Sequence, residues 1–466
     1  MKNQEKIIDE IVKKVVSKIS NQDAMDTESC GLFDSMNEAV EAAYKGQKEL
    51  MDRSMSDRRK YVECIRAELL KSENLHTLSK LGADETGMGK YDHKLIKNRL
   101  VVEKTPGIED LVTEAMAGDD GLTLVEFSPY GVIGAITPTT NPSETIICNT
   151  IGMIASGNSV VFAPHPRAIE TSKTTIKLIN KALNEAGAPK NLVVSINKPS
   201  INEANTMIHH PKIKMLVATG GPDIVRIVLS SGKKAIGAGA GNPPVVVDET
   251  ADIEKAAKDI IDGASFDNNI PCIAEKEVIA VDAIVDYLIF NMKKNGAYEL
   301  SEKAKINELR NLVITPEGKP KTEFVGKDAS YILDKIGIKA DHDIRMIIFE
   351  AEKDDLFVIE ELMMPILPIV RVDNVDQAID LAIEVENGNR HTAIMHSKNV
   401  DKLTEMAKKI QTTIFVKNGP SYAGIGVGGE GYTTFTIAGP TGEGLTSAKT
   451  FARKRRCVLV GGFNIK

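Results

Sequence analysis

The chain has 466 residues, of which 42% are hydrophobic and 26% are charged. This composition is typical of a soluble globular protein, and the length predicts two or three domains rather than a single core. A formal net charge of -7 argues against a nucleic-acid partner, and no apolar run approaches the ~20 residues that span a bilayer, so we expect no membrane attachment.

The first 20 residues predict an amphipathic helix. Apolar residues recur on one helical face, at Ile7, Ile8, Ile11, Val12, Val15, Val16 and Ile19. A polar linker over residues 21–31 separates this N-terminal helix from the rest of the chain. Its apolar face needs a covering surface. That surface is either the protein's own domain or a partner protein that binds the helix in a groove.

From residue 32 to about residue 107 the pattern predicts mainly helices, and short apolar strands then alternate with amphipathic helices. This alternation is typical of a parallel sheet with helices on both faces. We expect two such series, divided near the glycine-rich segment 237–244. Strands are expected within 121–138, 159–164, 191–196 and 213–221 in the first series, and within 242–249, 276–281, 366–372 and 413–419 in the second.

The five cysteines are scattered and include no Cys-X-X-Cys pair, so we predict neither a disulfide framework nor a zinc site, and a reducing cytoplasm fits best. Cys272 differs from the others because it follows a proline in the loop "FDNNIPCIAEK", where a reactive thiol can be reached. Gly220 and Gly221 end a predicted strand before a helix, where free N–H groups can bind a phosphate. His165 and His391 lack metal-ligand spacing, so no metal is expected.

Several longer segments together resemble the aldehyde dehydrogenase superfamily, and within it the coenzyme-A-acylating branch. They are "ITPTTNPSE", "GNSVVFAPHPRA", "VATGG", "GAGAGNPPVVVDETAD", "SFDNNIPCIAEKEV", "GNRHTAIMHSKN" and "IFVKNGPSYAGIGVGGEGYTTFTIAGPTGEGLTSA". The resemblance covers nearly all of the chain after the linker. Within the branch, the sequence is similar first to the propionaldehyde dehydrogenases of microcompartments that degrade 1,2-propanediol, and next to the acetaldehyde enzymes of ethanolamine breakdown.

The resemblance implies an α/β aldehyde dehydrogenase fold with three parts. A Rossmann-like nucleotide-binding domain would comprise residues 32–111 and 128–239, and an α/β catalytic domain residues 240–444. A small β oligomerisation arm would combine residues 112–127 with 445–466. Strands of such arms pair across subunits, so a dimer or a tetramer is implied.

Cys272 matches the nucleophile of the family. Its thiolate would attack the aldehyde carbonyl to give a thiohemiacetal, whose hydride passes to NAD and leaves an acyl thioester. The oxyanion formed between these steps needs donors, which the family supplies from the cysteine N–H and an amide side chain. Asn141 is the candidate amide, reached by a one-residue shift, since an ungapped comparison places Thr140 at that position.

The same resemblance implies a set of NAD-binding residues. Gly220 and Gly221 match the pyrophosphate turn, and Glu361 matches the glutamate that contacts the nicotinamide ribose. Ala163 replaces the lysine that usually holds the adenosine ribose, which leaves both NAD and NADP open. The remaining candidates are Thr137, Pro138, Pro164 and His165. For the phosphates of coenzyme A the candidates are Arg167 and the basic run Arg453–Arg456.

One departure from the hydrolytic aldehyde dehydrogenases bears on the product. Those enzymes carry a glutamate base where this chain has Ala238, so no carboxylate there would activate water, whereas the thiol of coenzyme A ionises far more readily than water. The implied reaction oxidises a short aldehyde to acyl-CoA, with propionaldehyde preferred and acetaldehyde as the alternative. The rival interpretations are a hydrolytic enzyme and an inactive scaffold bound to a shell.

The resemblance also gives the N-terminal helix a partner. Microcompartment dehydrogenases of this kind carry a short amphipathic helix and a linker, which dock the enzyme to shell proteins. Residues 1–20 therefore predict a targeting helix and a location inside a bacterial microcompartment in the cytoplasm.

Overall fold

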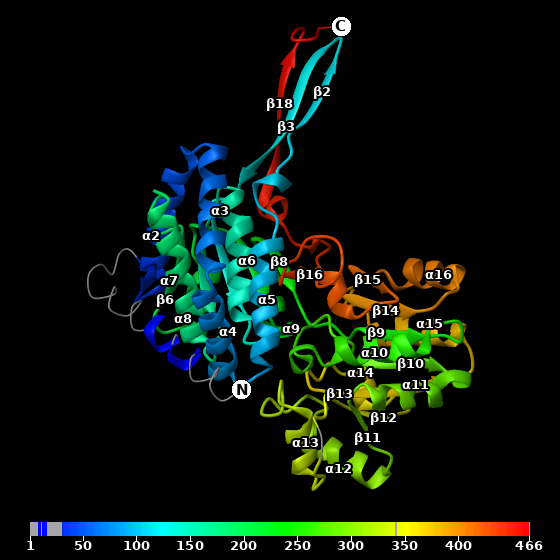
Figure 1. Ribbon diagram of the computed structural model, residues 1–466. Helices are drawn as coiled ribbons and strands as arrows, with labels where there is room; N and C mark the ends of the chain where they lie inside the picture. The colour runs from blue at the N-terminus through cyan, green and yellow to red at the C-terminus, as the bar shows by residue number, and fades with distance from the viewer. Residues whose placement is uncertain (1–7, 11, 16–29, 341–342, 466) are drawn as a thin grey trace.

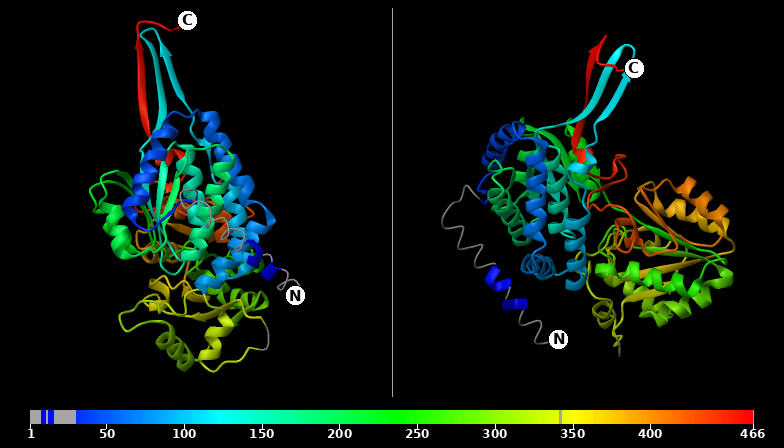
Figure 2. Two further views of the ribbon diagram at one scale, coloured as in Figure 1. Left: turned by 90° about the vertical axis from the view of Figure 1, so that its left-hand side faces the viewer. Right: turned by 45° about the horizontal axis from the view of Figure 1, so that its top comes forward.

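The computed structural model describes residues 8–10, 12–15, 30–340 and 343–465. Two α/β bodies lie side by side, each built on a parallel sheet, and a three-stranded β arm projects from the first of them (Figures 1 and 2). The predicted α/β fold with two strand–helix series is confirmed. The strands of each parallel sheet lie within the residue range predicted for one domain. The exact residues at which the domains begin and end stay a prediction.

The first sheet has six parallel strands in the order β1-β6-β5-β4-β7-β8. Both of its faces are buried, because Val160 and Phe162 of β5 join one hydrophobic cluster while Val161 and Ala163 join another. Helices α6 and α7 cover one face, with α3, α4 and α5 outside them, and α2, α8 and α9 cover the other (Figure 1).

The strands of this body are β1 (Leu32–Phe33), β4 (Val132–Thr137), β5 (Ser159–Pro164), β6 (Val193–Ile196), β7 (Ile213–Thr219) and β8 (Lys234–Ala238). Its helices are α2 (Met36–Met51), α3 (Met55–Leu69), α4 (Ser72–Thr86), α5 (Tyr91–Lys104), α6 (Pro142–Ala155), α7 (Ile169–Glu185), α8 (Ile201–His209) and α9 (Pro222–Leu229), with a 3-10 turn η1 (Ile108–Asp110).

The second sheet has seven parallel strands in the order β11-β12-β13-β10-β9-β14-β15. Helices α10 and α11 pack on one face, and α15 and α16 on the other. The chain passes from the first sheet to the second between β8 and β9, inside the glycine-rich segment.

The strands of this body are β9 (Pro244–Val247), β10 (Glu277–Val281), β11 (Ala297–Glu299), β12 (Met346–Glu350), β13 (Ile366–Val372), β14 (Thr392–His396) and β15 (Ile414–Lys417). Its helices are α10 (Ile253–Ala264), α11 (Asp282–Lys294), α12 (Lys303–Val313), α13 (Ala329–Lys335), α14 (Leu356–Ile359), α15 (Val375–Glu386) and α16 (Val400–Ile410), with the 3-10 turns η2 (Phe266–Asn269) and η3 (Ser421–Ile425).

The arm is an antiparallel sheet of β2 (Glu114–Gly118), β3 (Gly121–Pro129) and β18 (Ala452–Val460), in which Cys457 lies opposite Leu124. Before β18 come a short hairpin, β16 (Ile437–Ala438) and β17 (Gly444–Leu445), and the turn η4 (Ala448–Phe451). The arm leaves apolar side chains exposed on both outer strands, at Met116, Val458, Leu459 and Val460. Its role in oligomerisation stays a prediction.

The N-terminal helix is described over residues 8–10 and 12–15, which are helical, and the rest of residues 1–29 lies outside the described residues. Val12 and Val15 are buried, and the Asp9 carboxylate lies 3.0 Å from Nζ of Lys80 in α4. In this structure the helix thus lies against its own domain, the first of the two predicted arrangements. Within the described ranges, no helix has the length and apolar character that a membrane crossing requires.

Candidate active site

The loop before Cys272 adopts an uncommon backbone conformation. Asp267, Asn268 and Asn269 are consecutive left-handed residues, with φ of 50°, 55° and 66°. Among residues with a side chain, Asn and Asp enter this region most readily, because their short polar groups bond locally. The "DNN" sequence therefore allows a tight turn between α10 and the cysteine.

The side chains of this turn then fix its position. Asn269 Nδ2 donates to the carbonyl oxygens of Ala264 and Glu275, both at 2.8 Å, and so closes the loop on itself. Asn268 Nδ2 donates to the Gly326 carbonyl at 3.0 Å and ties the loop to the body of the second domain. The turn is thus held by its own buried amides.

A buried lysine completes the loop. Lys276 Nζ donates to the backbone carbonyl and the side-chain oxygen of Asn269, at 2.8 and 2.7 Å, and to the Pro271 carbonyl at 3.3 Å. Burial lowers the pKa of Lys276 despite the carboxylate of Glu361 nearby. Lys276 therefore closes the turn on the side that carries Cys272.

Cys272 is half-buried at the junction of the two bodies. A Cβ placed on Gly241, in the segment that joins the two sheets, would lie 2.8 Å from both the Cys272 carbonyl oxygen and Cγ of His391. Burial raises the pKa of the Cys272 thiol to about 12, and Glu361 adds to this while Lys276 and Lys97 oppose it. The loop therefore positions a thiol that is protonated at rest, instead of lowering its pKa.

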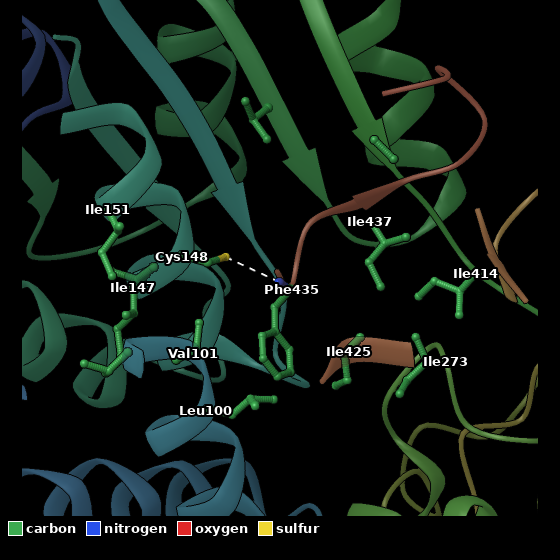
Figure 3. Close-up of a cluster of buried hydrophobic side chains, with 14 of the residues drawn as sticks. Leu100, Val101, Ile147, Cys148, Ile151, Ile273, Ile414, Ile425, Phe435 and Ile437 are labelled. Carbon is green, nitrogen blue, oxygen red and sulfur yellow. Dashed lines mark hydrogen bonds between the residues drawn. The ribbon is translucent and has the colours of Figure 1, made fainter. Parts of the chain in front are cut away.

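The residue after the nucleophile anchors it in the core. Ile273 belongs to a buried cluster in which Phe435 lies between Leu100 of α5 and Ile425 of η3 (Figure 3). Cys148 is a buried packing residue of this cluster, and its Sγ accepts a bond from the Phe435 N–H at 3.5 Å. The packing of Ile273 limits how far the Cys272 main chain can move.

His391 is a site residue that the sequence pattern did not reveal. It is buried beside Gly241, its Nδ1 lies 2.9 Å from Oγ1 of Thr392, and its Nε2 has no partner among the described residues. Burial and the nearby Lys276 lower its pKa to about 4. A neutral imidazole with a nitrogen that has no partner among the described residues can accept a proton.

A cavity of about 320 Å³ lies at the carboxyl ends of β4, β5 and β7. From β4 the chain winds outward through β5 and β6 on one side and through β7 and β8 on the other, and nucleotides bind at such a switch point. Seven of the predicted cofactor residues line it, namely Thr137, Pro138, Ala163, Pro164, His165, Gly220 and Gly221. Ser200, Ile201 and Ile224 line it as well, but they carry no recognisable motif.

The cavity has features that fit a dinucleotide. Gly221 precedes α9, whose first turn offers the backbone N–H groups that follow Pro222 to a phosphate, while the largely apolar walls suit an aromatic base. Oγ1 of Thr137 is buried and has no partner among the described residues, so it remains free for a ligand hydroxyl. These residues would bind the nucleotide half of NAD.

Glu361 lies outside this cavity, where its carboxylate faces the Gly241 N–H beside Cys272. Its Oε1 is buried without a hydrogen-bond partner in the described part of the chain, and burial raises its pKa to about 7. Such an oxygen could accept a ribose hydroxyl near the thiol. Among the described residues no group of three or more His, Cys, Asp or Glu side chains is arranged to hold a metal ion.

The other predicted residues lie in varied surroundings. Asn141 is the N-cap of α6, and its Oδ1 accepts a bond from Lys97 while its Nδ2 lies 3.3 Å from Oγ1 of Thr140. Its role as an oxyanion donor stays a prediction. Arg167 lines a second cavity of about 380 Å³ with Lys327. The run Arg453–Arg456 lies on the exposed strand β18, and the role of both basic groups as CoA contacts stays a prediction.

The nucleotide cavity, the glycine-rich joint and the cysteine loop agree with known proteins. The aldehyde dehydrogenase family pattern matches residues 4–301, and this chain belongs to that family. The CoA-propanoylating propanal dehydrogenase of Citrobacter freundii is 48% identical over 460 residues, which cover 98% of this chain and 99% of that protein. The acetylating acetaldehyde dehydrogenase of Salmonella typhimurium is 45% identical over 98% of this chain and 99% of its own length.

Solved structures give the same result. The propionaldehyde dehydrogenase of Rhodopseudomonas palustris with bound CoA and an acylated cysteine has a TM-score of 0.93 and 65% identity, covering 94% of this chain and 100% of that one. The propionaldehyde dehydrogenase of the Clostridium phytofermentans fucose utilisation microcompartment has a TM-score of 0.91 and 55% identity, covering 94% and 100%. The resemblance inferred from the motifs is confirmed.

Proposed function

We propose that this protein oxidises a short aliphatic aldehyde, propionaldehyde first, to its acyl-CoA ester with NAD and coenzyme A. The observation that carries this proposal is Cys272, held on a hydrogen-bonded loop whose main chain and the neutral imidazole of His391 both lie against Gly241. Its support is the similarity to CoA-propanoylating enzymes over nearly the whole chain.

In the first half-reaction, His391 Nε2 takes the proton of the Cys272 thiol and passes it to solvent, Cys272 Sγ bonds to the aldehyde carbon, and the carbonyl oxygen becomes an oxyanion. The Cys272 N–H and the Asn141 amide are the proposed donors to this oxygen. NAD supplies the hydride acceptor, and the acyl group stays on Cys272 as a thioester. In the second half-reaction, His391 Nε2 takes the proton of the CoA thiol, and the thiolate displaces Cys272 from the acyl carbon.

Omitting CoA provides the test of this function. Ala238 ends β8 without a carboxylate to activate water, so the thioester should persist and only a burst of about one NADH per active site should form. Steady turnover should then be roughly 10²- to 10⁴-fold slower than with CoA, the usual contribution of a general base. The measurement is NADH absorbance with propionaldehyde and NAD, with and without CoA.

Steady NADH formation at the full rate without CoA would instead establish a hydrolytic enzyme, and no burst at all would favour an inactive scaffold. Repeating the assay with acetaldehyde distinguishes the alternative substrate. One methylene in an apolar pocket changes kcat/KM by roughly 10- to 200-fold, so a ratio above about 10 in favour of propionaldehyde is expected. The reverse ratio would assign the acetaldehyde activity.

Two macromolecular partners are part of the proposal. The exposed apolar strands of the arm support a homo-oligomer, a dimer or a tetramer, which sedimentation of the full chain tests. The amphipathic residues 1–20, together with a microcompartment enzyme among the relatives, support docking to shell proteins. Docking requires Val12 and Val15 to leave the domain surface on which they are buried. Deletion of residues 1–20 removes the proposed docking helix, and it should abolish co-purification with shells while leaving kcat unchanged. Retained co-purification would refute the docking role.

A further inference from the structure

A cluster of charged side chains is buried next to the nucleophile loop. Nζ of Lys97 lies 2.6 Å from Oδ2 of Asp267, 3.0 Å from Oε1 of Glu144 and 2.6 Å from Oδ1 of Asn141. A second ammonium, that of Lys94, lies 3.2 Å from the same Asp267 oxygen. Lys97 and Asp267 are fully buried, and the other three side chains are nearly so.

The charges of this cluster balance, with two lysines against two carboxylates. Burial disfavours the charged form of Lys97, but Asp267 and Glu144 outweigh it and raise its pKa. Likewise, Lys94 and Lys97 overcome burial and lower the pKa of Asp267. Burial of a charge costs free energy unless groups of opposite charge and hydrogen-bond partners surround it. The Lys97 ammonium group is therefore restricted to the position between its partners.

Lys97 joins two segments that are distant in sequence and both belong to the site. Asp267 is the first left-handed residue of the turn that carries Cys272, and its Oδ1 also accepts the Lys90 N–H at 2.7 Å. Asn141 is the residue just before α6. One ammonium group on α5 therefore sets the spacing between the nucleophile loop and the proposed oxyanion donor.

The bond to Lys97 also determines which way the Asn141 amide faces. With Oδ1 bound to an ammonium, the NH₂ group must point away from Lys97, because a flipped amide would set two donors against each other. The ammonium further polarises the amide and makes its N–H a stronger donor. Both effects favour a developing negative charge on a bound oxygen.

We propose that Lys97 is a positioning residue, which orients and polarises Asn141 toward the oxyanion formed on Cys272. This inference rests on the proposed acylating function. It makes the oxyanion site a three-residue unit in which Lys97 touches no substrate. Lys94 still pairs with Asp267 when Lys97 is removed, so the loss should slow acylation mainly through Asn141 and should matter little once the amide is gone.

A double-mutant cycle tests this. The rate of the NADH burst without CoA is measured for Lys97→Met, Asn141→Ala and the double variant. Lys97→Met and Asn141→Ala should each slow the burst by roughly 10²-fold, as loss of one oxyanion donor does, and the double variant should be no more than about threefold slower than Asn141→Ala. Multiplicative losses would overturn the proposal.

Lys94→Met is the matched control, because within the described residues Lys94 contacts Asp267 and forms no hydrogen bond with Asn141. Its effect should multiply with that of Asn141→Ala, as expected for a change that acts on the loop alone. If Lys94→Met also has little effect on the burst rate once Asn141 is alanine, the coupling is not specific to the Lys97–Asn141 contact and the proposal is refuted. Thermal unfolding of each variant confirms that it is folded.

A spectroscopic measurement separates orientation from general damage. Propionyl-CoA labelled with ¹³C at the carbonyl acylates Cys272, and infrared spectroscopy reports its C=O stretch. Loss of a donated hydrogen bond should shift this band to higher frequency in Lys97→Met and in Asn141→Ala alike, and an unshifted band in Lys97→Met would contradict the proposal. Should Lys97→Met fail to fold, the same double-mutant cycle is carried out with Lys97→Gln, which keeps a hydrogen-bond donor in the cluster.

The proposed function is judged separately, on the wild type. A wild type without any CoA-dependent turnover would reject the proposed function itself.

Discussion

Alanine in place of Cys272 should reduce NADH formation from propionaldehyde, NAD and CoA by at least about 10⁴-fold, because no other group can form the thioester. Of the five free thiols, Cys148 is buried in the core and Cys457 lies on the arm. Steady-state assays of the purified variant, with its oligomeric state compared with that of the wild type, provide the measurement. Loss of a nucleophile leaves well under about a thousandth of the wild-type turnover. A higher residual turnover in the variant would therefore show that another residue is the nucleophile.

Cys64→Ala is the matched control, since Cys64 is a half-buried thiol on α3, outside the site, and its loss should leave turnover intact. Alkylation by iodoacetamide adds an independent readout. Burial raises the pKa of Cys272 to about 12, so its thiolate fraction should rise about tenfold for each unit of pH between neutrality and that value. Inactivation that reaches a plateau near pH 8, the ordinary thiol range, would show that the thiolate is stabilised instead.

Gly241→Ala should lower kcat/KM by at least about 10²-fold, the effect of displacing a reacting group by about an ångström. Its new Cβ would lie 2.8 Å from the Cys272 carbonyl oxygen and from the His391 ring, and neither can move far in a packed site. Overpacking of this kind should also destabilise the fold by about 1–3 kcal/mol. Kinetics and chemical denaturation measure the two effects.

Gly239→Ala is the control for stability, because a Cβ at Gly239 would meet nothing within 4 Å and its backbone is not left-handed. Its free energy of unfolding should match that of the wild type. If Gly241→Ala is equally stable and equally active, the close contact between the glycine-rich joint and the nucleophile loop is not required for the reaction.

Much of the site could be predicted because it depends on local sequence. Strands such as β5 and β13 are short apolar runs with clear ends, and their ranges agree with the predicted ones. Seven cofactor candidates from separate segments line one cavity, since the carboxyl ends of parallel strands meet at the same edge. Ordinary sheet geometry therefore assembles this half of the site.

The other half depends on contacts that no local pattern reveals. Lys97 has the sequence context of any lysine on a helix, yet it is buried against Asn141 and Asp267. His391 has no carboxylate at a telling spacing, and only the fold sets it beside Gly241. The sequence pattern likewise left open where the N-terminal helix packs, because an apolar face does not specify its partner.

The left-handed turn before the nucleophile also limits how this loop can vary. Each of its three positions excludes β-branched and bulky side chains, which would cost on the order of 1–3 kcal/mol apiece in that conformation. Glycine would fit the backbone but would lose the side-chain amide hydrogen bonds that close the loop. It would also raise the conformational entropy of the unfolded chain, which makes folding less favourable. Random mutation of these codons followed by selection for folded protein should therefore return almost only Asn and Asp, a narrow tolerance that the backbone conformation and the side-chain hydrogen bonds set before any demand of chemistry is applied.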